Sequence, residues 1–385
     1  MKRILYIVYA GIFYIYRILP LNNNKTTFIM THDKSINGNI MCMVRKIKEE
    51  QPDHICKFIT KLQLKDKNML KKIFEILKFL ILTPYYLATS KTIFLDNIFL
   101  PMSYMKFNSS VKVIQLWHGC NTLKKFGQLS NNGVLKKIEK KANSQYTHVI
   151  VSSKKMIKLH KEAFGVKENV IYPLGLPRMD ILFNKKKIEQ EKNKFYKKHR
   201  NLKNKKIILY APTFRDNNLS EFDSNMDLRD IIEKLPSEYI IINKFHPFVA
   251  QKYGKIDSER VIDMSNYEDL TRLLLVADIL ISDYSSIIFD YSILNKPIIY
   301  YAYDKEKYKE NIRGFYYEYE KYVESEIVIF KYDLIKSIIN VNYIDTNKSK
   351  FINKYVDYKD ENSSYRIYYK IYKEWLLVVN LNIFI

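Results

Sequence analysis

Short apolar runs alternate with segments of helical periodicity along most of the chain. Strands of a parallel sheet are covered on both faces and read as continuous apolar runs, whereas the covering helices carry one apolar face. In the first half, the runs predicted to be strands are residues 26–30, 54–59, 92–95, 111–116, 148–152 and 169–172. Helices are expected at residues 40–47, at 69–87 with an interruption at Pro84, at 134–141 and at 154–164. This alternation predicts an α/β fold with a parallel sheet covered by helices.

The same pattern restarts after residues 175–180, which we interpret as a crossing between two domains. The predicted strands there are residues 206–210, 239–242, 261–263, 279–282 and 298–301. A chain of 385 residues is too long for one core of typical size and fits two. We therefore predict one domain over residues 25–176, a second over 177–360, and a helix over 361–385 that packs back on the first.

Residues 1–24 form a separate segment, which is apolar and aromatic after Lys2-Arg3. It lacks the small-residue cleavage site of a signal peptide, and Arg17 and four tyrosines disfavour a spanning helix. A helix lying in the membrane interface suits these residues better, so we expect the segment to associate with a membrane. A helix buried within the protein remains the alternative.

The formal net charge of +23 calls for an anionic partner: nucleic acid, an acidic membrane surface or a phosphorylated substrate. A helix predicted over residues 184–206 is loaded with lysine, and its charged face is either solvated or docked on anionic lipid. The three cysteines, Cys42, Cys56 and Cys120, indicate neither a disulfide framework nor a zinc site and favour a reducing compartment.

Polar side chains without an obvious structural duty follow three predicted strands of the second half. They are Arg215 after the strand at 206–210, Lys244 and His246 after that at 239–242, and Ser285 and Ser286 after that at 279–282. Ligands of an open parallel sheet bind outside the carboxyl ends of its strands. These side chains are therefore predicted to converge on a phosphorylated ligand, with Arg313 as a further clamp.

Ser285 and Ser286 also lie where a strand hands over to a predicted helix. The free N–H groups and the dipole of a helix N-terminus favour a phosphate, and two hydroxyls add donors. An ordinary capped helix with nothing bound is the other interpretation of this stretch.

In the first half, the strand at 111–116 delivers Trp117-His118-Gly119 to its carboxyl end. A histidine there suits a general base, because its unperturbed pKa lies near the working pH. In isolation a hydrogen-bonded structural histidine is the commoner role, but a phosphate crevice expected across the cleft favours the base. Nothing nearby marks Cys120 as an activated nucleophile.

Common sequence motifs for nucleotide cofactors and metal ions are absent from the sequence. It contains no Gly-x-Gly, no Walker loop, no Asp-x-Asp and no metal-spaced cluster of histidine and cysteine. We therefore expect neither a dinucleotide cofactor nor a metal ion.

Six stretches together resemble the CDP-glycerol glycerophosphotransferases of teichoic acid synthesis. In the order of the family they are residues 115–119 with 123–127, 175–180, 210–216, 246–247, 281–286 with 289–290, and 313–316. The resemblance covers nearly the whole chain. It implies two Rossmann-like domains facing a cleft, as in glycosyltransferases of the B type, and a peripheral enzyme on the cytoplasmic face of the cell membrane.

The resemblance also implies roles for individual residues. The domain over 25–176 would hold the acceptor and the domain over 177–360 the CDP-alditol. His118 and His246 match the two motif histidines considered essential. The residues expected to bind substrate are Lys124, Thr213, Arg215, Lys244, Asp283, Ser285, Ser286 and Arg313.

The expected reaction transfers glycerol phosphate from CDP-glycerol to an undecaprenyl-diphosphate-linked acceptor and releases CMP, without a cofactor and against an anionic membrane surface. Polymerising members typically read His-Gly-Thr-Pro-Leu-Lys, whereas Cys120-Asn121-Thr122-Leu123 separates Gly119 from Lys124 here, which looks more like the priming members.

CDP-ribitol or another CDP-alditol remains an alternative donor. A nucleotide-sugar glycosyltransferase for capsule explains the crevice but not the combined motifs. A nucleic-acid-binding protein explains only the charge, so we expect no nucleic acid partner.

Overall fold

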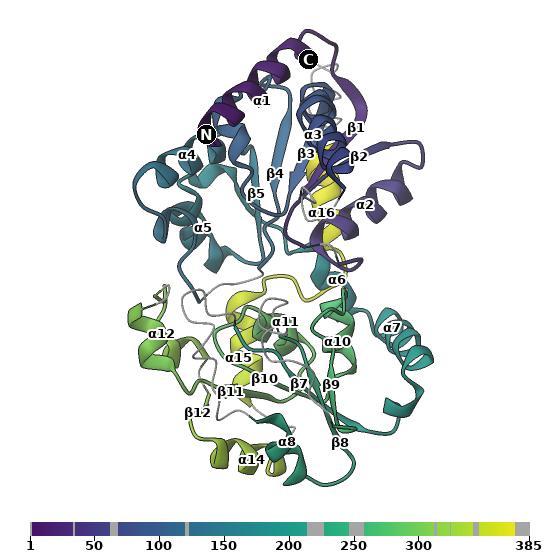
Figure 1. Ribbon diagram of the computed structural model, residues 1–385, viewed down its shortest axis with the longest axis vertical. Helices are drawn as coiled ribbons and strands as arrows, with labels where there is room; N and C mark the ends of the chain where they lie inside the picture. The colour runs from purple at the N-terminus through teal and green to yellow at the C-terminus, as the bar shows by residue number, and fades with distance from the viewer. Residues whose placement is uncertain are drawn as a thin grey trace, which may run out of the picture. The chain divides into compact units, whose positions relative to one another are not determined.

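The computed structural model describes residues 2–33, 35–61, 68–119, 123–213, 227–245, 258–311, 314–323, 325–341 and 346–373. The chain divides into two compact units. The first unit consists of Met1–His118, Phe126–Asp180 and Asp357–Ile385, and the second of Gly119–Lys125 and Ile181–Val356. Within the residues just given, each unit holds one six-stranded sheet (Figure 1). The predicted α/β fold with parallel sheets is confirmed.

The first sheet has the strand order β2-β1-β3-β4-β5-β6, and all its pairs are parallel. Its strands are β1 (Asn22–Met30), β2 (Ile55–Thr60), β3 (Ser90–Leu95), β4 (Lys112–Gln115), β5 (His148–Val151) and β6 (Ile171–Pro173). The chain adds β2 on one side of β1 and the later strands on the other. The strand order therefore reverses between β1 and β3, which is the switch point where open α/β sheets bind ligands.

The α-helices of the first unit are α1 (Lys2–Tyr16), α2 (Asn39–Glu50), α3 (Met69–Thr89), α4 (Gly133–Asn143), α5 (Ile157–Phe164) and α16 (Ser363–Tyr368). Its short 3₁₀ helices are η1 (Leu100–Tyr104), η2 (Gly127–Leu129), η3 (Lys154–Met156), η4 (Glu168–Val170) and η5 (Pro177–Met179), and η7 (Tyr369–Lys373) is a π-helix. The short helix α6 (Asp180–Phe183) crosses from the first unit into the second. Gln51, directly after α2, donates to the hydroxyl of Tyr368 at 2.9 Å, so α16 lies against the first unit.

The predicted interruption of α3 at Pro84 is wrong, because α3 runs through it as one helix. A proline inside a helix removes one backbone hydrogen bond. Packing offsets that loss here: α1 lies against this turn, with the Tyr9 and Thr83 hydroxyls 2.5 Å apart and the Tyr9 and Phe79 rings 5.2 Å apart.

The second sheet has the order β12-β11-β10-β7-β8-β9, again with parallel pairs only. Its strands are β7 (Lys206–Tyr210), β8 (Tyr239–Asn243), β9 (Val261–Asp263), β10 (Ile279–Ser282), β11 (Ile298–Tyr301) and β12 (Ile327–Val328). The strand order reverses between β7 and β10, so the second switch point lies there. Buried isoleucines of β7, β8 and β10 form the centre of the core with Leu334 and Ile338.

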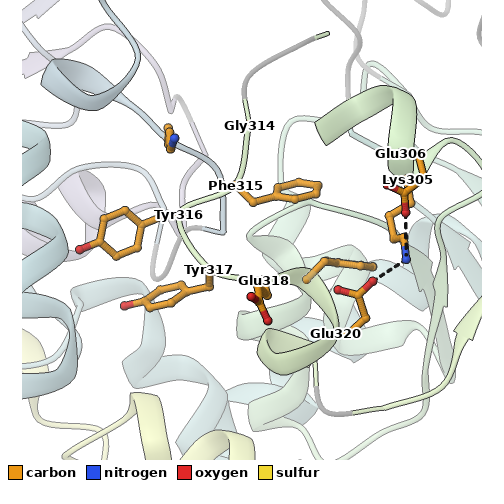
Figure 2. Close-up of a pocket in the computed structure, with 10 residues that line it drawn as sticks. Lys305, Glu306, Gly314, Phe315, Tyr316, Tyr317, Glu318 and Glu320 are labelled. Atoms are coloured by element: carbon orange, nitrogen blue, oxygen red, sulfur yellow. Dashed lines mark hydrogen bonds and ion pairs between the residues drawn. The ribbon is translucent and has the colours of Figure 1, made fainter. Parts of the chain in front are cut away.

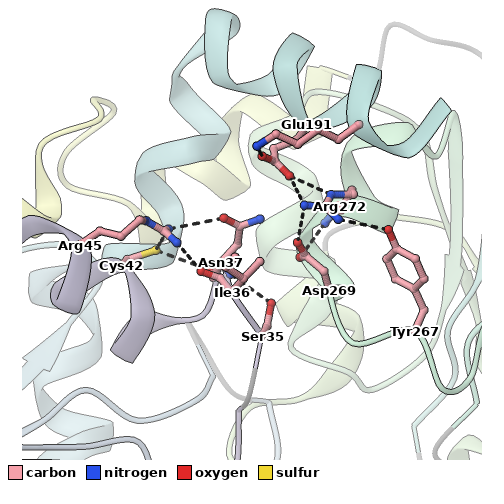
Figure 3. A network of polar contacts seen from close by, with 10 residues as sticks. Ser35, Ile36, Asn37, Cys42, Arg45, Glu191, Tyr267, Asp269 and Arg272 are labelled. Atoms are coloured by element: carbon pink, nitrogen blue, oxygen red, sulfur yellow. Dashed lines mark hydrogen bonds and ion pairs between the residues drawn. The ribbon is translucent and has the colours of Figure 1, made fainter. Parts of the chain in front are cut away.

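The α-helices of the second unit include α7 (Lys185–Lys198), α8 (Leu228–Glu233), α10 (Leu270–Val276), α11 (Ile287–Ile293), α12 (Lys305–Asn311), α13 (Tyr319–Val323), α14 (Lys331–Ile339) and α15 (Thr346–Tyr355), with the turn η6 (Arg200–Leu202). The lysine-rich helix α7 ends well before the predicted residue 206. Its buried Glu191 pairs with Arg272 of α10, which also lies 3.5 Å from Asp269 (Figure 3). This ion pair fixes one face of α7 and leaves its lysines on the outside.

Candidate active site

A buried carboxylate lies at the switch point of the first sheet. Asp96 follows β3 directly and is 1% exposed. Its oxygens accept hydrogen bonds from the backbone N–H groups of Thr31 (2.9 Å), His32 (3.1 Å) and Asp33 (2.9 Å), which follow β1. Burial raises the pKa of Asp96, and the three N–H groups oppose that rise. This arrangement, the Asp96 clasp, fastens the loop after β1 to the end of β3.

The next strand, β4, leads into a strained turn. Trp117 has a φ of 56°, which is unfavourable for a residue with a side chain. Its N–H donates to Gln115 Oε1 at 2.8 Å, and its carbonyl oxygen accepts from Asn39 Nδ2 at 3.1 Å. Its ring stacks on Phe126 with 4.9 Å between centroids. These contacts hold the turn and thereby set the direction of His118.

His118 itself is half-buried, and its ring has a defined tautomer. Nδ1 lies 2.9 Å from the backbone carbonyl oxygen of Asp96. A carbonyl oxygen only accepts, so this hydrogen bond assigns the proton to Nδ1 and makes Nε2 the basic nitrogen of the neutral ring. Arg178 donates from Nη1 to the His118 carbonyl oxygen at 2.6 Å, and its own N–H donates to Asn39 Oδ1 at 3.1 Å. The backbone on both sides of the imidazole is thus fixed.

Residues 175–180 contact both the start of α16 and the backbone of His118. Gly175 has a φ of 81°, and a Cβ there would lie 2.4 Å from the Ser363 hydroxyl, so glycine is required. The buried Asp180 carboxylate accepts from the N–H groups of Ser363 (2.8 Å) and Ser364 (2.9 Å). The stretch therefore anchors the start of α16 while Arg178 holds His118.

The switch point of the second sheet carries a matching carboxylate. Asp283 follows β10, is 1% exposed, and accepts from the backbone N–H of Thr213, which follows β7, at 2.8 Å. It also accepts from the N–H of Tyr284 at 2.6 Å. We name this arrangement the Asp283 clasp. Thr213 and Asp283, both predicted to bind substrate, are thus in direct contact. In this structure the Asp283 carboxylate binds the backbone of the loop after β7.

Lys244, at the end of β8, is also held within its unit. Its ammonium donates to the backbone carbonyls of Ser265 and Tyr267, each at 2.7 Å. Burial lowers its pKa, and the nearby Asp263 carboxylate partly opposes this. Two of its three donors are therefore used inside the protein, and it adds a fixed charge to this strand end.

Ser285 and Ser286 are half-buried between β10 and α11. The Ser285 hydroxyl accepts from the N–H of Ile287 at a long 3.4 Å, and Ser286 stands at the N-cap position without a side-chain capping bond. Ordinary helix capping therefore explains only the long hydrogen bond of Ser285. It does not explain the Ser286 hydroxyl, which makes no capping bond.

Lys124 lies in a short antiparallel bridge with Phe315. The bridge is closed by the Tyr316 N–H, which donates to the Leu123 carbonyl at 2.7 Å. A pocket of about 340 Å³ lies beside it (Figure 2). Its lining is Lys125, Lys305, Glu306, Gly314, Phe315, Tyr316, Tyr317, Glu318, Tyr319 and Glu320. Glu306 and Glu320 pair with Lys305, so the pocket is aromatic rather than strongly cationic.

Three predicted site residues, Arg215, His246 and Arg313, lie outside the described residues. Among the part of the chain that is described, no group of three or more histidine, cysteine or acidic residues is arranged to hold a metal ion.

Sequence reasoning missed Asp96, His32 and Asn39. The rule that selected polar residues after the strands of the second half applies equally to His32 after β1 and Asp96 after β3. Asn39 lies inside α2 as an ordinary polar residue, and no sequence pattern marks its bonds to Trp117 and Arg178.

Several known proteins are similar to this chain in sequence or in fold. The family model described as CDP-Glycerol:Poly(glycerophosphate) glycerophosphotransferase matches residues 12–373. A teichoic acid glycerol-phosphate primase of Bacillus subtilis is 38% identical over 296 residues, 74% of either chain. A teichoic acid poly(ribitol-phosphate) polymerase of Bacillus spizizenii is 32% identical over 92% of this chain, which spans only 57% of that polymerase. The wall teichoic acid polymerase TagF has a similar fold, with a TM-score of 0.80 at 23% identity over 95% of this chain and 94% of the other.

Proposed function

Because the chain belongs to the CDP-glycerol:poly(glycerophosphate) glycerophosphotransferase family of transferases, we propose that it transfers glycerol phosphate from CDP-glycerol to a lipid-linked acceptor. The acceptor hydroxyl attacks the phosphorus that carries glycerol, the bond from that phosphorus to the CMP oxygen breaks, and CMP leaves. Phosphoryl transfer depends mainly on positioning and charge stabilisation, which side chains and backbone N–H groups supply.

The observation that supports this proposal best is the state of His118. The hydrogen bond from Nδ1 to the Asp96 carbonyl oxygen leaves Nε2 as the basic nitrogen, at the carboxyl ends of the central strands of the first unit. In the proposal, Nε2 takes the proton of the acceptor hydroxyl while the new bond to phosphorus forms. The fixed Trp117 turn and the Arg178 contact keep the ring ready for that transfer.

We assign donor binding to the second unit. Ser285 and Ser286 supply hydroxyl donors at the end of β10, and Lys244 supplies positive charge at the end of β8. The sequence-predicted residues Thr213, Asp283, Lys124, Arg215, His246 and Arg313 complete the assigned set, with His246 expected to act on the CMP leaving group. No cofactor or metal enters the proposed reaction.

CDP-ribitol is the second candidate donor. A relative with 32% identity is named a poly(ribitol-phosphate) polymerase, whereas the relative with 38% identity is named a glycerol-phosphate primase. The longer stretch from His118 to Lys124 favours a single priming addition in our proposal.

We further propose that the enzyme lies on the cytoplasmic face of the cell membrane, where a lipid-linked acceptor is held. In the described chain, no helix combines the length and apolarity needed to span a bilayer. The packed helices α1 and α3 nevertheless expose a run of large apolar side chains, which we name the α1/α3 apolar face: Ile4, Leu5, Ile7, Val8, Ile15, Met69, Leu70, Ile73, Phe74 and Leu77. Such a face on a basic protein suits insertion into an anionic membrane surface.

The test is CMP release with product mass, using the purified protein, a soluble-tailed lipid-linked disaccharide, and either CDP-glycerol or CDP-ribitol. One added glycerol phosphate is the expected product. A ladder of products would make the protein a polymerase, and a product formed only with CDP-ribitol would change the donor. Absence of CMP release with both donors would contradict the proposed function.

A further inference from the structure

Two imidazole rings lie face to face at the switch point of the first unit. The ring centroids of His32 and His118 are 3.6 Å apart and their planes differ by 8°. Asp96 fixes both residues, because its carboxylate accepts from the His32 backbone N–H and its carbonyl accepts from His118 Nδ1. The stacking therefore has structural support from two independent hydrogen bonds.

The charge state of His32 suits this position. Its pKa is lowered, chiefly because surrounding protein atoms displace water from part of the ring. The carboxylates of Asp96 and Asp33 oppose this, while the cations of Arg178 and Lys61 lower the pKa further. His32 is therefore neutral near pH 7. His32 is nevertheless an exposed residue as a whole, so its replacement should not disturb the core.

Resting on the role proposed above for His118, we propose that His32 is a positioning residue for the transfer reaction. Its neutral ring lies flat on His118, keeps that ring in one orientation, and stabilises the imidazolium that forms when Nε2 takes the acceptor proton. A neutral aromatic face attracts a cation stacked on it. A second imidazolium at this separation would instead repel the first.

The experiment compares His32→Phe, which keeps a flat neutral ring, with His32→Ala, which removes it. His32→Ala is expected to lower kcat by about tenfold with the KM for CDP-glycerol unchanged, and His32→Phe to restore kcat to within about threefold of wild type. A matched control is His148→Ala, which removes a histidine stacked on Tyr172 at 4.8 Å elsewhere in the same unit and should leave kcat unchanged. Thermal melting confirms that each variant is folded.

A pH profile adds a readout that a purely structural role would not move. Since the base must be neutral to work, kcat falls at acid pH as His118 becomes protonated. His32→Phe should leave the midpoint of that fall unchanged. His32→Lys places a lasting charge beside His118, disfavours its imidazolium, and should move the midpoint about one pH unit lower.

Two results would overturn the inference: wild-type kcat in His32→Ala, or a loss in His32→Phe as large as that in His32→Ala. The second would mean that His32 acts through its nitrogens instead of its flat ring. Both differ from failure of the proposed function, in which wild-type protein itself would release no CMP from either donor.

Discussion

The two switch points of the molecule are built on the same plan. In each sheet, a buried aspartate follows the strand beside the first strand and accepts backbone N–H groups from the loop after that first strand. The Asp96 clasp gathers three such groups, and the Asp283 clasp gathers one from Thr213 and one from Tyr284. The two parallel sheets therefore organise the carboxyl ends of their strands in the same way.

The two units differ in what surrounds these clasps. The first clasp supports a pair of imidazoles and a strained turn, which suits proton transfer. The second lies beside hydroxyls and an ammonium, which suits holding an anion. The α1/α3 apolar face also belongs to the first unit, whereas the large exposed apolar side chains of the second unit are confined to the region of α14 in the described residues. We therefore propose different chemical roles for the two units.

The largest expected effect comes from removing the proposed base. His118→Ala should lower kcat by about 10³, because a positioned general base contributes about 10² to 10⁴ in rate. The measurement is CMP release under saturating CDP-glycerol. A matched control is His54→Ala, which replaces a buried histidine directly before β2 that bonds to Thr26 and lies outside the clasp. A kcat within threefold of wild type for His118→Ala would remove the proton-transfer role from the first unit.

The next largest effect is expected at acid pH, which should destabilise the first unit more than the second. Burial lowers the pKa of His54, His148 and His160 to about 4. Unfolding lets each take up a proton below about pH 6.5, so their contribution to stability is present above that pH and declines towards pH 4. Each of these histidines should lower the stability of the first unit by at most about 1.4 kcal/mol per pH unit in this window, and the raised pKa of Asp96, Glu139 and Asp180 opposes part of that loss.

Hydrogen exchange followed by mass spectrometry at pH 7 and pH 5 measures this directly. Strands β1 to β5 should lose more protection than β7, β8 and β10. Equal losses in both units would show that the buried histidines do not govern acid stability.

Removing each clasp aspartate should change a different kinetic constant, kcat or the KM for CDP-glycerol, by about tenfold to a hundredfold. Asp96→Ala leaves three N–H groups without their acceptor and should lower kcat more than it raises the KM for CDP-glycerol. Asp283→Ala should mainly raise that KM, because it loosens the Thr213 loop at the proposed donor site. The same pattern in both variants would mean that the clasps are structural supports with no division of labour.

The smallest effect is expected at the membrane. Replacing Ile7, Ile73 and Phe74 by serine should weaken binding to vesicles with anionic lipid by about tenfold, because three apolar side chains no longer leave water. The matched control replaces Phe330 and Tyr332 of the second unit, which are 68% and 77% exposed. If vesicle binding weakened only in the control variant, the docking surface would lie on the second unit and the proposed α1/α3 surface would be wrong.

Apolar periodicity predicted much of the fold, because most strands of both sheets contain a short apolar run and alternate with segments of helical period. It failed at Pro84, where packing of α1 against α3 outweighs the local cost of proline. It also extended the lysine-rich helix beyond Lys198, since charged residues give no signal for where a helix ends.

The candidate site was predicted less evenly. His118, Thr213 and Asp283 follow strands in recognisable motifs, whereas Asp96 and His32 obey the same strand-end rule without a motif. The contacts of Asn39 and Arg178 join segments far apart in the sequence, so only the fold reveals them. The roles predicted for Arg215, His246 and Arg313 stay predictions.

The proposed division of labour gives the base to the first unit and the donor to the second. Calorimetric titration of CDP-glycerol into His118→Ala and into the double variant Ser285→Ala with Ser286→Ala tests it without relying on turnover. We predict wild-type affinity for His118→Ala and affinity at least about tenfold weaker for the double variant. Weakened binding in His118→Ala together with unchanged binding in the double variant would contradict this division.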